Sequence, residues 1–156
     1  MLQTVGWDLH LATPMDFVKV FLGLGILFSD DKVRVQGQLG VTEMPTTKTL
    51  HYTKKYCEFF ADLCLQEYEF QKYDSETLAV SIILCARKGV KISPVWNAEL
   101  STLTSKTYED VQECYRKIYT FYQKSFPTPG SEIKEEKRIN VKRQASNEKK
   151  LDRSTS

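Results

Sequence analysis

The sequence predicts an all-α protein: a five-helix bundle packed around one buried central helix, followed by a disordered C-terminal tail. Helix-start signals recur along the chain, apolar residues repeat at helical spacing, and residues 78–86 are apolar on nearly every side. A chain of 156 residues is long enough for one domain with its own hydrophobic core. We therefore place the folded domain at residues 1–126 and the tail at residues 127–156.

The first helix is expected from Pro14 to about Phe28. Thr13 can cap the free amides, Pro14 suits the first helical position, and Asp16 can complete a capping box. The polar run that starts at Ser29 ends the apolar pattern. Residues 29–47 are then expected to form a loop with some extended structure around Val33 and Val35.

Residues 48–66 are expected to form an amphipathic helix, with one apolar face and one charged face. Asp74 or Ser75 then caps the segment from Leu78 to Ala86. A helix that is apolar all round is buried on all sides, so this segment is predicted to be the central helix.

Two more helices complete the bundle. Ser93 and Pro94 repeat the cap-plus-proline signal and are expected to open a short helix that ends near residue 103. Thr107 and Asp110 form another capping box, which opens a helix to about Phe126.

Composition argues against several functional classes. Residues 1–130 hold fourteen Lys and Arg against fifteen Asp and Glu, whereas residues 131–156 hold eight against five. A nearly neutral domain lacks the broad basic face that phosphate-backbone binding requires, so nucleic acid is an unlikely partner. No apolar run reaches the roughly 20 residues that span a bilayer, so no membrane contact is expected. We expect a nuclear or cytoplasmic protein.

The chain also lacks the motifs of an enzyme, a metal site or a cofactor site. Its two histidines, His10 and His51, have no partner at zinc-ligand spacing, and its glycines do not form a phosphate-binding loop. The four cysteines form no Cys-x-x-Cys pair and lie in segments with apolar periodicity, which predicts reduced, structural thiols. No catalytic residue, metal or cofactor is predicted.

The order of these features resembles the C-terminal, or second, cyclin box. Trp7, Asp8 and Leu9, followed by Pro14 and Phe17, are similar to the family segment that leaves the linker between the two boxes and enters the first helix of the second box. On this resemblance, residues 1–8 are the end of that linker.

Later parts of the chain continue the resemblance to cyclins of the A, B and J kinds. The matching positions, which form a structural signature rather than a catalytic site, are Tyr73, Leu78, Ala79, Trp96, Leu100, Tyr108 and Cys114. We expect Trp96 to bury its ring against the central helix. Asp74 stands where the family often has proline.

The resemblance implies a non-catalytic subunit that binds or regulates a cyclin-dependent protein kinase in cell-cycle control. In the cyclin family, kinase docking belongs mainly to the first box, and on this resemblance we expect no first box before Leu2. The expected partner is therefore the kinase or a separate first cyclin box. A truncated gene model, an isoform and a split second box remain open alternatives for this chain. An alternative function is a helical scaffold or transcription-factor module of the transcription factor IIB type.

The tail is expected to regulate rather than fold. Arg143 lies three residues before Ser146, which is the spacing that basophilic kinases accept, so Ser146 is a candidate phosphosite. Short matches of this kind also arise by chance in basic segments. A phosphate would offset at least half of the tail's excess positive charge.

Overall fold

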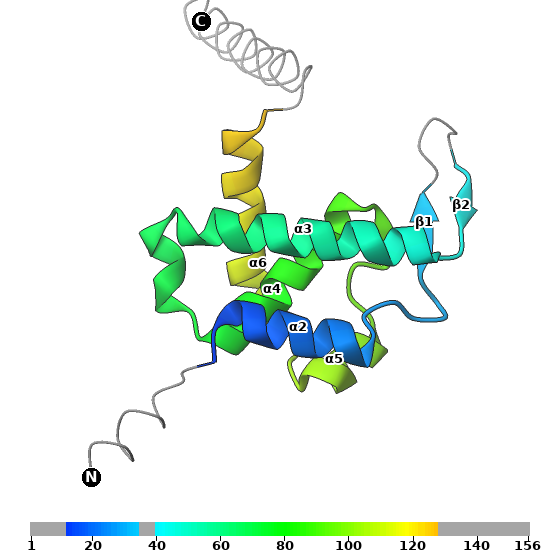
Figure 1. The fold of residues 1–156 in the computed structure, drawn as a ribbon, viewed down its shortest axis with the longest axis horizontal. Helices are drawn as coiled ribbons and strands as arrows, with labels where there is room; N and C mark the ends of the chain where they lie inside the picture. The colour runs from blue at the N-terminus through cyan, green and yellow to red at the C-terminus, as the bar shows by residue number, and fades with distance from the viewer. Residues whose placement is uncertain (1–11, 35–39, 128–156) are drawn as a thin grey trace, which may run out of the picture. The chain divides into compact units, whose positions relative to one another are not determined.

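The computed structural model describes residues 12–34 and 40–127 and confirms the all-α prediction. These residues contain five α-helices, one 3-10 helix and a small three-stranded sheet (Figure 1). The elements are α2 (Pro14–Leu24), β1 (Lys32–Arg34), β2 (Thr42–Glu43), α3 (Thr47–Leu65), η1 (Tyr68–Lys72), α4 (Ser75–Gly89), β3 (Ile92–Ser93), α5 (Ala98–Thr104) and α6 (Tyr108–Ser125).

Helix α2 begins where the sequence predicts and ends four residues early. Thr13 and Asp16 form the expected capping box, and Pro14 is the first helical residue. The prediction that the helix continues to Phe28 is wrong. Gly25 adopts a φ of 97°, a left-handed conformation that glycine tolerates, and its N–H bonds to Phe21 at 3.0 Å to close the last turn.

Helix α3 lies within one residue of its predicted bounds at both ends. Its N-cap is Thr46, which exchanges hydrogen bonds with Thr49. Cys57 and Phe60 are fully buried, as expected for its apolar face. Leu65, by contrast, is 73% exposed at the last position of the helix.

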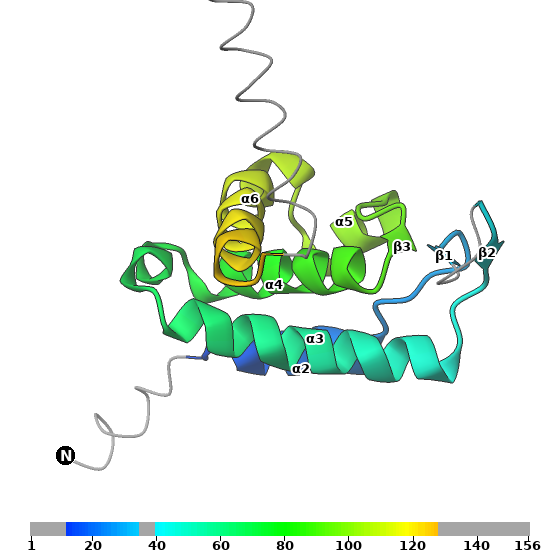
Figure 2. The same cartoon turned by 90° about the horizontal axis from the view of Figure 1, so that it is seen from above.

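Helix α4 is the central helix that the sequence predicts. Asp74 is its N-cap and accepts a hydrogen bond from the Thr77 N–H at 2.8 Å. Every residue from Thr77 to Arg87 is buried. Figure 2 shows α3, with α2 behind it, on one side of α4, and α5 and α6 on the other side of α4. The core is therefore built around α4.

The segment predicted as a loop contributes two strands. β1 pairs antiparallel with β2 and with β3, so the strand order is β2-β1-β3. Val33 lies opposite Glu43 on one side and Ile92 on the other, which confirms extended structure there. Val35 lies outside the described residues.

The start of α5 differs from the prediction at Ser93 and Pro94. Ser93 belongs to β3, and the Ser93–Pro94 peptide bond is cis. The helix begins at Ala98 instead, because the Asn97 side chain caps it by accepting a hydrogen bond from the Leu100 N–H at 2.8 Å. Asn at a cap position therefore outweighs the serine-proline signal.

Helix α6 starts at the predicted capping box. Asp110 accepts bonds from the backbone N–H and the hydroxyl of Thr107, at 2.8 and 2.7 Å. Two α4 side chains bond to its backbone: the Ser81 hydroxyl donates to the Val111 carbonyl at 3.4 Å, and the Cys85 thiol lies 3.8 Å from the Tyr115 carbonyl. Near the end of the helix, the rings of Tyr122 and Phe126 lie 5.7 Å apart.

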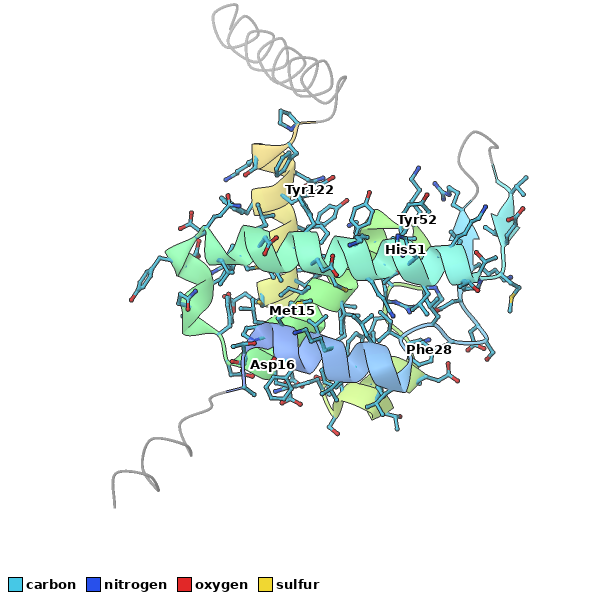
Figure 3. All side chains as sticks on the ribbon, in the orientation of Figure 1. Met15, Asp16, Phe28, His51, Tyr52 and Tyr122 are labelled. Atoms are coloured by element: carbon cyan, nitrogen blue, oxygen red, sulfur yellow. The ribbon has the colours of Figure 1, made fainter. Side chains whose placement is uncertain are left out.

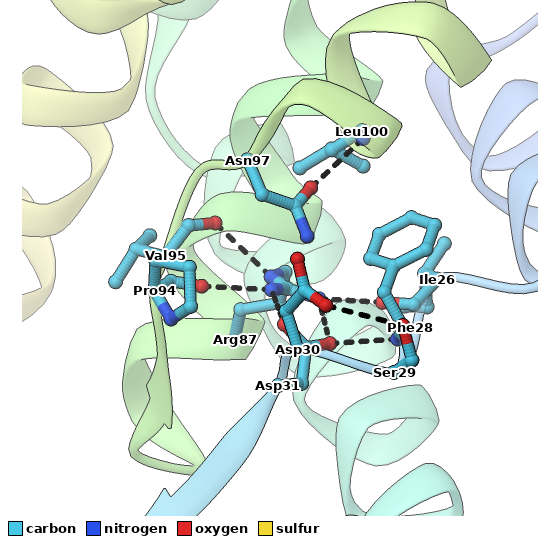
Figure 4. A network of polar contacts seen from close by, with 10 residues as sticks. All are labelled: Ile26, Phe28, Ser29, Asp30, Asp31, Arg87, Pro94, Val95, Asn97 and Leu100. Carbon is cyan, nitrogen blue, oxygen red and sulfur yellow. Dashed lines mark hydrogen bonds and ion pairs between the residues drawn. The ribbon is translucent and has the colours of Figure 1, made fainter.

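A buried ion pair between Arg87 and Asp31 joins α4 to two loops (Figure 4). Both side chains have no exposed surface. The guanidinium pairs with both carboxylate oxygens and also donates to the carbonyls of Ile26, Pro94 and Val95. Five acceptors thus match the five N–H groups of the arginine side chain. A buried charge is costly unless it is paired and hydrogen-bonded in this way. The sequence analysis did not predict this contact.

Candidate interaction surface

An apolar groove of about 360 Å³ opens between the start of α2, the end of α3, η1 and the first half of α4. This volume is at the small end of the range of roughly 300–1,000 Å³ typical of ligand pockets. Mostly apolar side chains line the groove, with a few polar groups at its edge. The lining residues are Thr13, Pro14, Met15, Ala61, Cys64, Leu65, Phe70, Gln71, Tyr73, Ser75, Leu78 and Ile82.

Two helix caps fix the walls of the groove. The capping box at Thr13 sets the first turn of α2, so that Met15 is held in the lining beside Asp16 at the start of the helix (Figure 3). The Asp74 cap sets the first turn of α4, where Leu78 and Ile82 are one turn apart on the same face. Two walls of the groove are therefore helix ends that capping hydrogen bonds hold in place.

Tyr73 stands at the edge of the groove and ties it to α6. Its hydroxyl donates a hydrogen bond to Glu113 at 2.9 Å, and Lys117 pairs with Glu113 at 3.2 Å. Partial burial and the Glu113 carboxylate raise the pKa of Tyr73, while the bonds from Tyr73 and Lys117 lower the pKa of Glu113. Both shifts keep the tyrosine neutral and the glutamate charged at neutral pH, as the hydrogen bond requires.

A second apolar surface lies on the outside of α2. Val20 is 57% exposed and Leu24 is 65% exposed, and Gly23 between them is also exposed. We call these three residues the α2 stripe. Only Val18 and Phe21 of the helix are buried. Val20 and Leu24 are four residues apart, so they lie on the same side of the helix.

The structure brings together three residues of the predicted signature. Pro14, Tyr73 and Leu78 all line the groove. Phe17 is half-buried on α2, and its ring lies 6.5 Å from that of Phe21.

Other signature residues lie elsewhere. Ala79, Leu100 and Cys114 are fully buried core residues. Trp96 is only half-buried, and its ring lies 6.0 Å from that of Tyr108 at the start of α6. The prediction that Trp96 is buried is therefore wrong, because it lies in the loop before α5 rather than within that helix. Trp7, Asp8, Leu9 and Ser146 lie outside the described residues.

The thiols of the described domain are poorly suited to chemistry. All four cysteines are free and buried. Burial raises the pKa of Cys57 and of Cys64 to about 12 and that of Cys114 to about 11, and it raises the pKa of Cys85 well above the ordinary value. They therefore stay protonated, whereas the reactive form of cysteine is the thiolate.

No metal-binding cluster is present in the part of the chain that the structure describes. There, no three His, Cys, Asp or Glu side chains come together so that they could hold a metal ion. His51 is exposed on the first half of α3, next to Tyr52 (Figure 3). Within residues 12–34 and 40–127, no helix has both the length and the apolar character needed to cross a membrane.

Sequence reasoning missed most of the groove. Met15, Ala61 and Gln71 come from three segments whose side-by-side position only the folded chain reveals. A usable signal was present in α2, where apolar residues occupy more positions than one buried face needs. Such an excess indicates an apolar surface that another element or protein can cover.

These features define a helical domain with an apolar groove and an exposed apolar stripe. Residues 12–155 match the family described as the cyclin C-terminal domain. The chain therefore belongs to the cyclin family, through its C-terminal domain. The match runs beyond the predicted domain boundary at residue 126.

The chain is similar to cyclins of the J and B kinds. It is 26% identical over 125 residues to a cyclin-J-like protein of Mus musculus, covering 78% of this chain and 30% of that protein. It is 25% identical over 118 residues to cyclin-J of Xenopus laevis, covering 76% of this chain and 29% of that one. A putative cyclin-B3-1 of Arabidopsis thaliana is 33% identical over 85 residues, which are 54% of this chain and 21% of the relative.

The chain thus spans about three-tenths of the length of the J-type relatives that it matches. No solved structure matches it.

Proposed function

We propose that this chain is a non-catalytic, cyclin-like regulatory subunit that binds a cyclin-dependent protein kinase in cell-cycle control. The observation that carries the proposal is the match of residues 12–155 to the cyclin C-terminal domain. The names of the relatives point the same way, since all three are called cyclins. The proposal assigns no catalytic residue to the chain.

The α2 stripe supports the proposal physically. Val20 and Leu24 present apolar side chains on a regular helix, which can pack against a helix of a partner. Burying an apolar side chain of this size is worth about 1.5–3 kcal/mol, so a few such contacts can support binding. We propose that the stripe contacts the kinase or a separate first cyclin box.

Binding of the full chain to a panel of purified cyclin-dependent kinases tests this function, with and without a first cyclin box added as a separate protein. We expect at least one kinase to bind under one of the two conditions. Val20→Asp with Leu24→Asp should weaken that binding by at least tenfold, because two charges would have to be buried without partners.

Met44→Asp is the matched control, since Met44 is 61% exposed and follows β2 instead of belonging to α2. It should bind as the wild type does. A folded wild-type chain that binds no kinase in either condition would contradict the proposed function. If Met44→Asp weakened kinase binding as much as the α2 variant does, only the role of the α2 stripe would be contradicted.

We also propose that the basic tail directs nuclear accumulation, which phosphorylation of Ser146 would reduce. The support is the excess of eight basic over five acidic residues in residues 131–156. Ser146→Ala, Ser146→Asp and a chain ending at Pro129 should differ in their nuclear fraction. Identical distributions in cells would remove both the import signal and the switch.

A further inference from the structure

We propose that the solvent face of the small sheet binds the phosphate group of a phosphorylated serine or threonine in a partner protein. Four side chains of that face would hold the phosphate: Lys32, Arg34, Thr42 and Ser93. The proposal does not depend on kinase binding by this chain. It rests on the register of the three strands and on the free state of these four side chains among the described residues.

The register of the sheet places the four side chains on one face. Residues that lie opposite each other in antiparallel strands point to the same side. Lys32 lies opposite Ser93 in β3, and Arg34 lies opposite Thr42 in β2. All four are exposed, whereas Val33 between the two basic residues is half-buried and its partner in β3 belongs to the core. The face that carries the four side chains therefore points to solvent.

The two basic side chains of this face have no ion pair or hydrogen bond with any described residue, and neither have its two hydroxyls. The acidic residues that precede β1 are engaged elsewhere. Asp30 accepts a hydrogen bond from the Ser29 hydroxyl at 3.1 Å, and Asp31 is buried against Arg87. The acidic residue of β2, Glu43, lies on the other face of the sheet. Two positive charges are therefore available to a ligand.

The buried ion pair between Arg87 and Asp31 holds the backbone of this site in place (Figure 4). Asp31 directly precedes β1 in the chain. The guanidinium also donates to the Pro94 carbonyl at 2.8 Å, and Pro94 directly follows β3. The backbone N–H of Arg34 donates to the Lys91 carbonyl at 3.2 Å, just before β3. The strands are therefore tied to the core, although the four side chains point to water.

A phosphate monoester matches this set of groups better than a carboxylate does. It carries roughly −1.5 to −2 charges at neutral pH and has three strong acceptor oxygens. An arginine can donate to two of these oxygens at once, a lysine adds a point charge, and the hydroxyls are further donors.

The spacing of the two basic residues also suits a single phosphate. Lys32 and Arg34 are two residues apart on a strand, so their Cα atoms are about 6.6 Å apart and both long side chains can reach one group. A nucleic acid is a poorer match, because it presents many phosphates, whereas the basic and acidic residues of residues 1–130 nearly balance.

An NMR titration of the full, isotope-labelled chain tests the proposal. The probe is a pentapeptide that has phosphoserine at its centre and alanine at the other positions. We expect the probe to shift the backbone amide signals of Lys32, Arg34, Thr42 and Ser93 in a saturable way. The same peptide with unmodified serine should cause no shift, and the peptide with glutamate should bind several-fold more weakly.

Removing the two charges should abolish binding. Lys32→Gln with Arg34→Gln should show no saturable shift, and Arg34→Lys should bind more weakly than wild type, because lysine lacks the planar fork of donors. Lys19→Gln with Lys54→Gln is the matched control, since it removes two positive charges from exposed positions on α2 and α3. It should bind as the wild type does. Equal urea midpoints establish that the variants are folded.

Four results would overturn the proposal. The first is a wild-type chain whose amide signals do not respond to the phosphopeptide. The second is binding that the Lys32 and Arg34 variant retains, or that the control variant loses as well. The third is equal binding of the glutamate peptide, which would indicate a site for carboxylates. The fourth is a single-stranded DNA that shifts the same signals at lower concentration than the phosphopeptide does, which would indicate a nucleic-acid ligand.

Discussion

Replacing Arg87 by methionine should remove a large part of the folding stability. Methionine fills similar space, so the change isolates the polar network from packing. It would leave the buried Asp31 carboxylate with the Phe28 N–H, 2.9 Å away, as its remaining bond in this network. It would also remove the donor from three carbonyl groups, of which that of Ile26 accepts at 2.6 Å.

Breaking a buried ion pair from one side typically costs about 3–5 kcal/mol. A domain of this size is stable by only about 5–15 kcal/mol in total, so the variant should be close to unfolding. Urea denaturation of the full chain, followed by far-UV circular dichroism, measures the loss. With a slope of about 2 kcal/mol per molar urea, the midpoint should fall by on the order of 2 M.

Lys72→Met is the control, because it also replaces a positively charged side chain by methionine, but at the surface of the domain. Lys72 is 48% exposed and contacts Glu69 at 3.7 Å, and such surface pairs contribute about 1 kcal/mol at most. Arg87→Lys should fall between wild type and Arg87→Met, because it keeps the charge but has fewer donors. If Arg87→Met were no less stable than the Lys72→Met control, the buried pair would not hold the loops together as we infer.

Three further predictions follow from the packing and the titrating groups. Gly89→Ala should destabilise the chain by about 1–3 kcal/mol, because the added Cβ would lie 2.8 Å from the Tyr56 ring. Gly23→Ala should stabilise the chain by about 0.5–1 kcal/mol, because nothing lies within 4 Å of the added Cβ. Urea midpoints that move in the same direction for both variants would contradict this. Hydrogen bonds from Thr107 lower the pKa of Asp110, so the stability that this carboxylate contributes is present at neutral pH and is lost as the pH falls below about 4. In Asp110→Asn, the urea midpoint should therefore depend less steeply on pH in the acid range. An unchanged pH dependence would refute the assignment. Ellman's reagent should react with none of the four cysteines in the folded chain and with all of them in urea, and rapid labelling of the folded chain would show that the thiols are accessible.

The sequence predicts well those features that neighbouring residues decide. The capping boxes at Thr13 and Thr107 involve partners three residues away, and both are found. The central helix is also predictable, because its apolar run allows no exposed face. The end of α2 is predictable only in part, since Gly25 stops the helix although apolar residues continue to Phe28.

Contacts between distant segments could not be predicted in this way. Arg87 and Asp31 are 56 residues apart, and nothing in either local pattern identifies the other. The predicted start of α5 is wrong because two residues that can cap a helix, Ser93 and Asn97, lie within five residues of each other. Only the folded chain shows that Ser93 belongs to strand β3. The groove combines four segments, so its existence depends on how they pack.

The complete burial of α4 has a consequence for how this domain can diverge. Eleven successive positions, Thr77 to Arg87, have no solvent-facing side, so a change of size or polarity at any of them disturbs the core. In α3, by contrast, exposed positions such as Lys54 and Glu58 recur between the buried ones. Related chains can therefore acquire new partners through their outer helices, while the central helix must keep nearly the same shape in all of them.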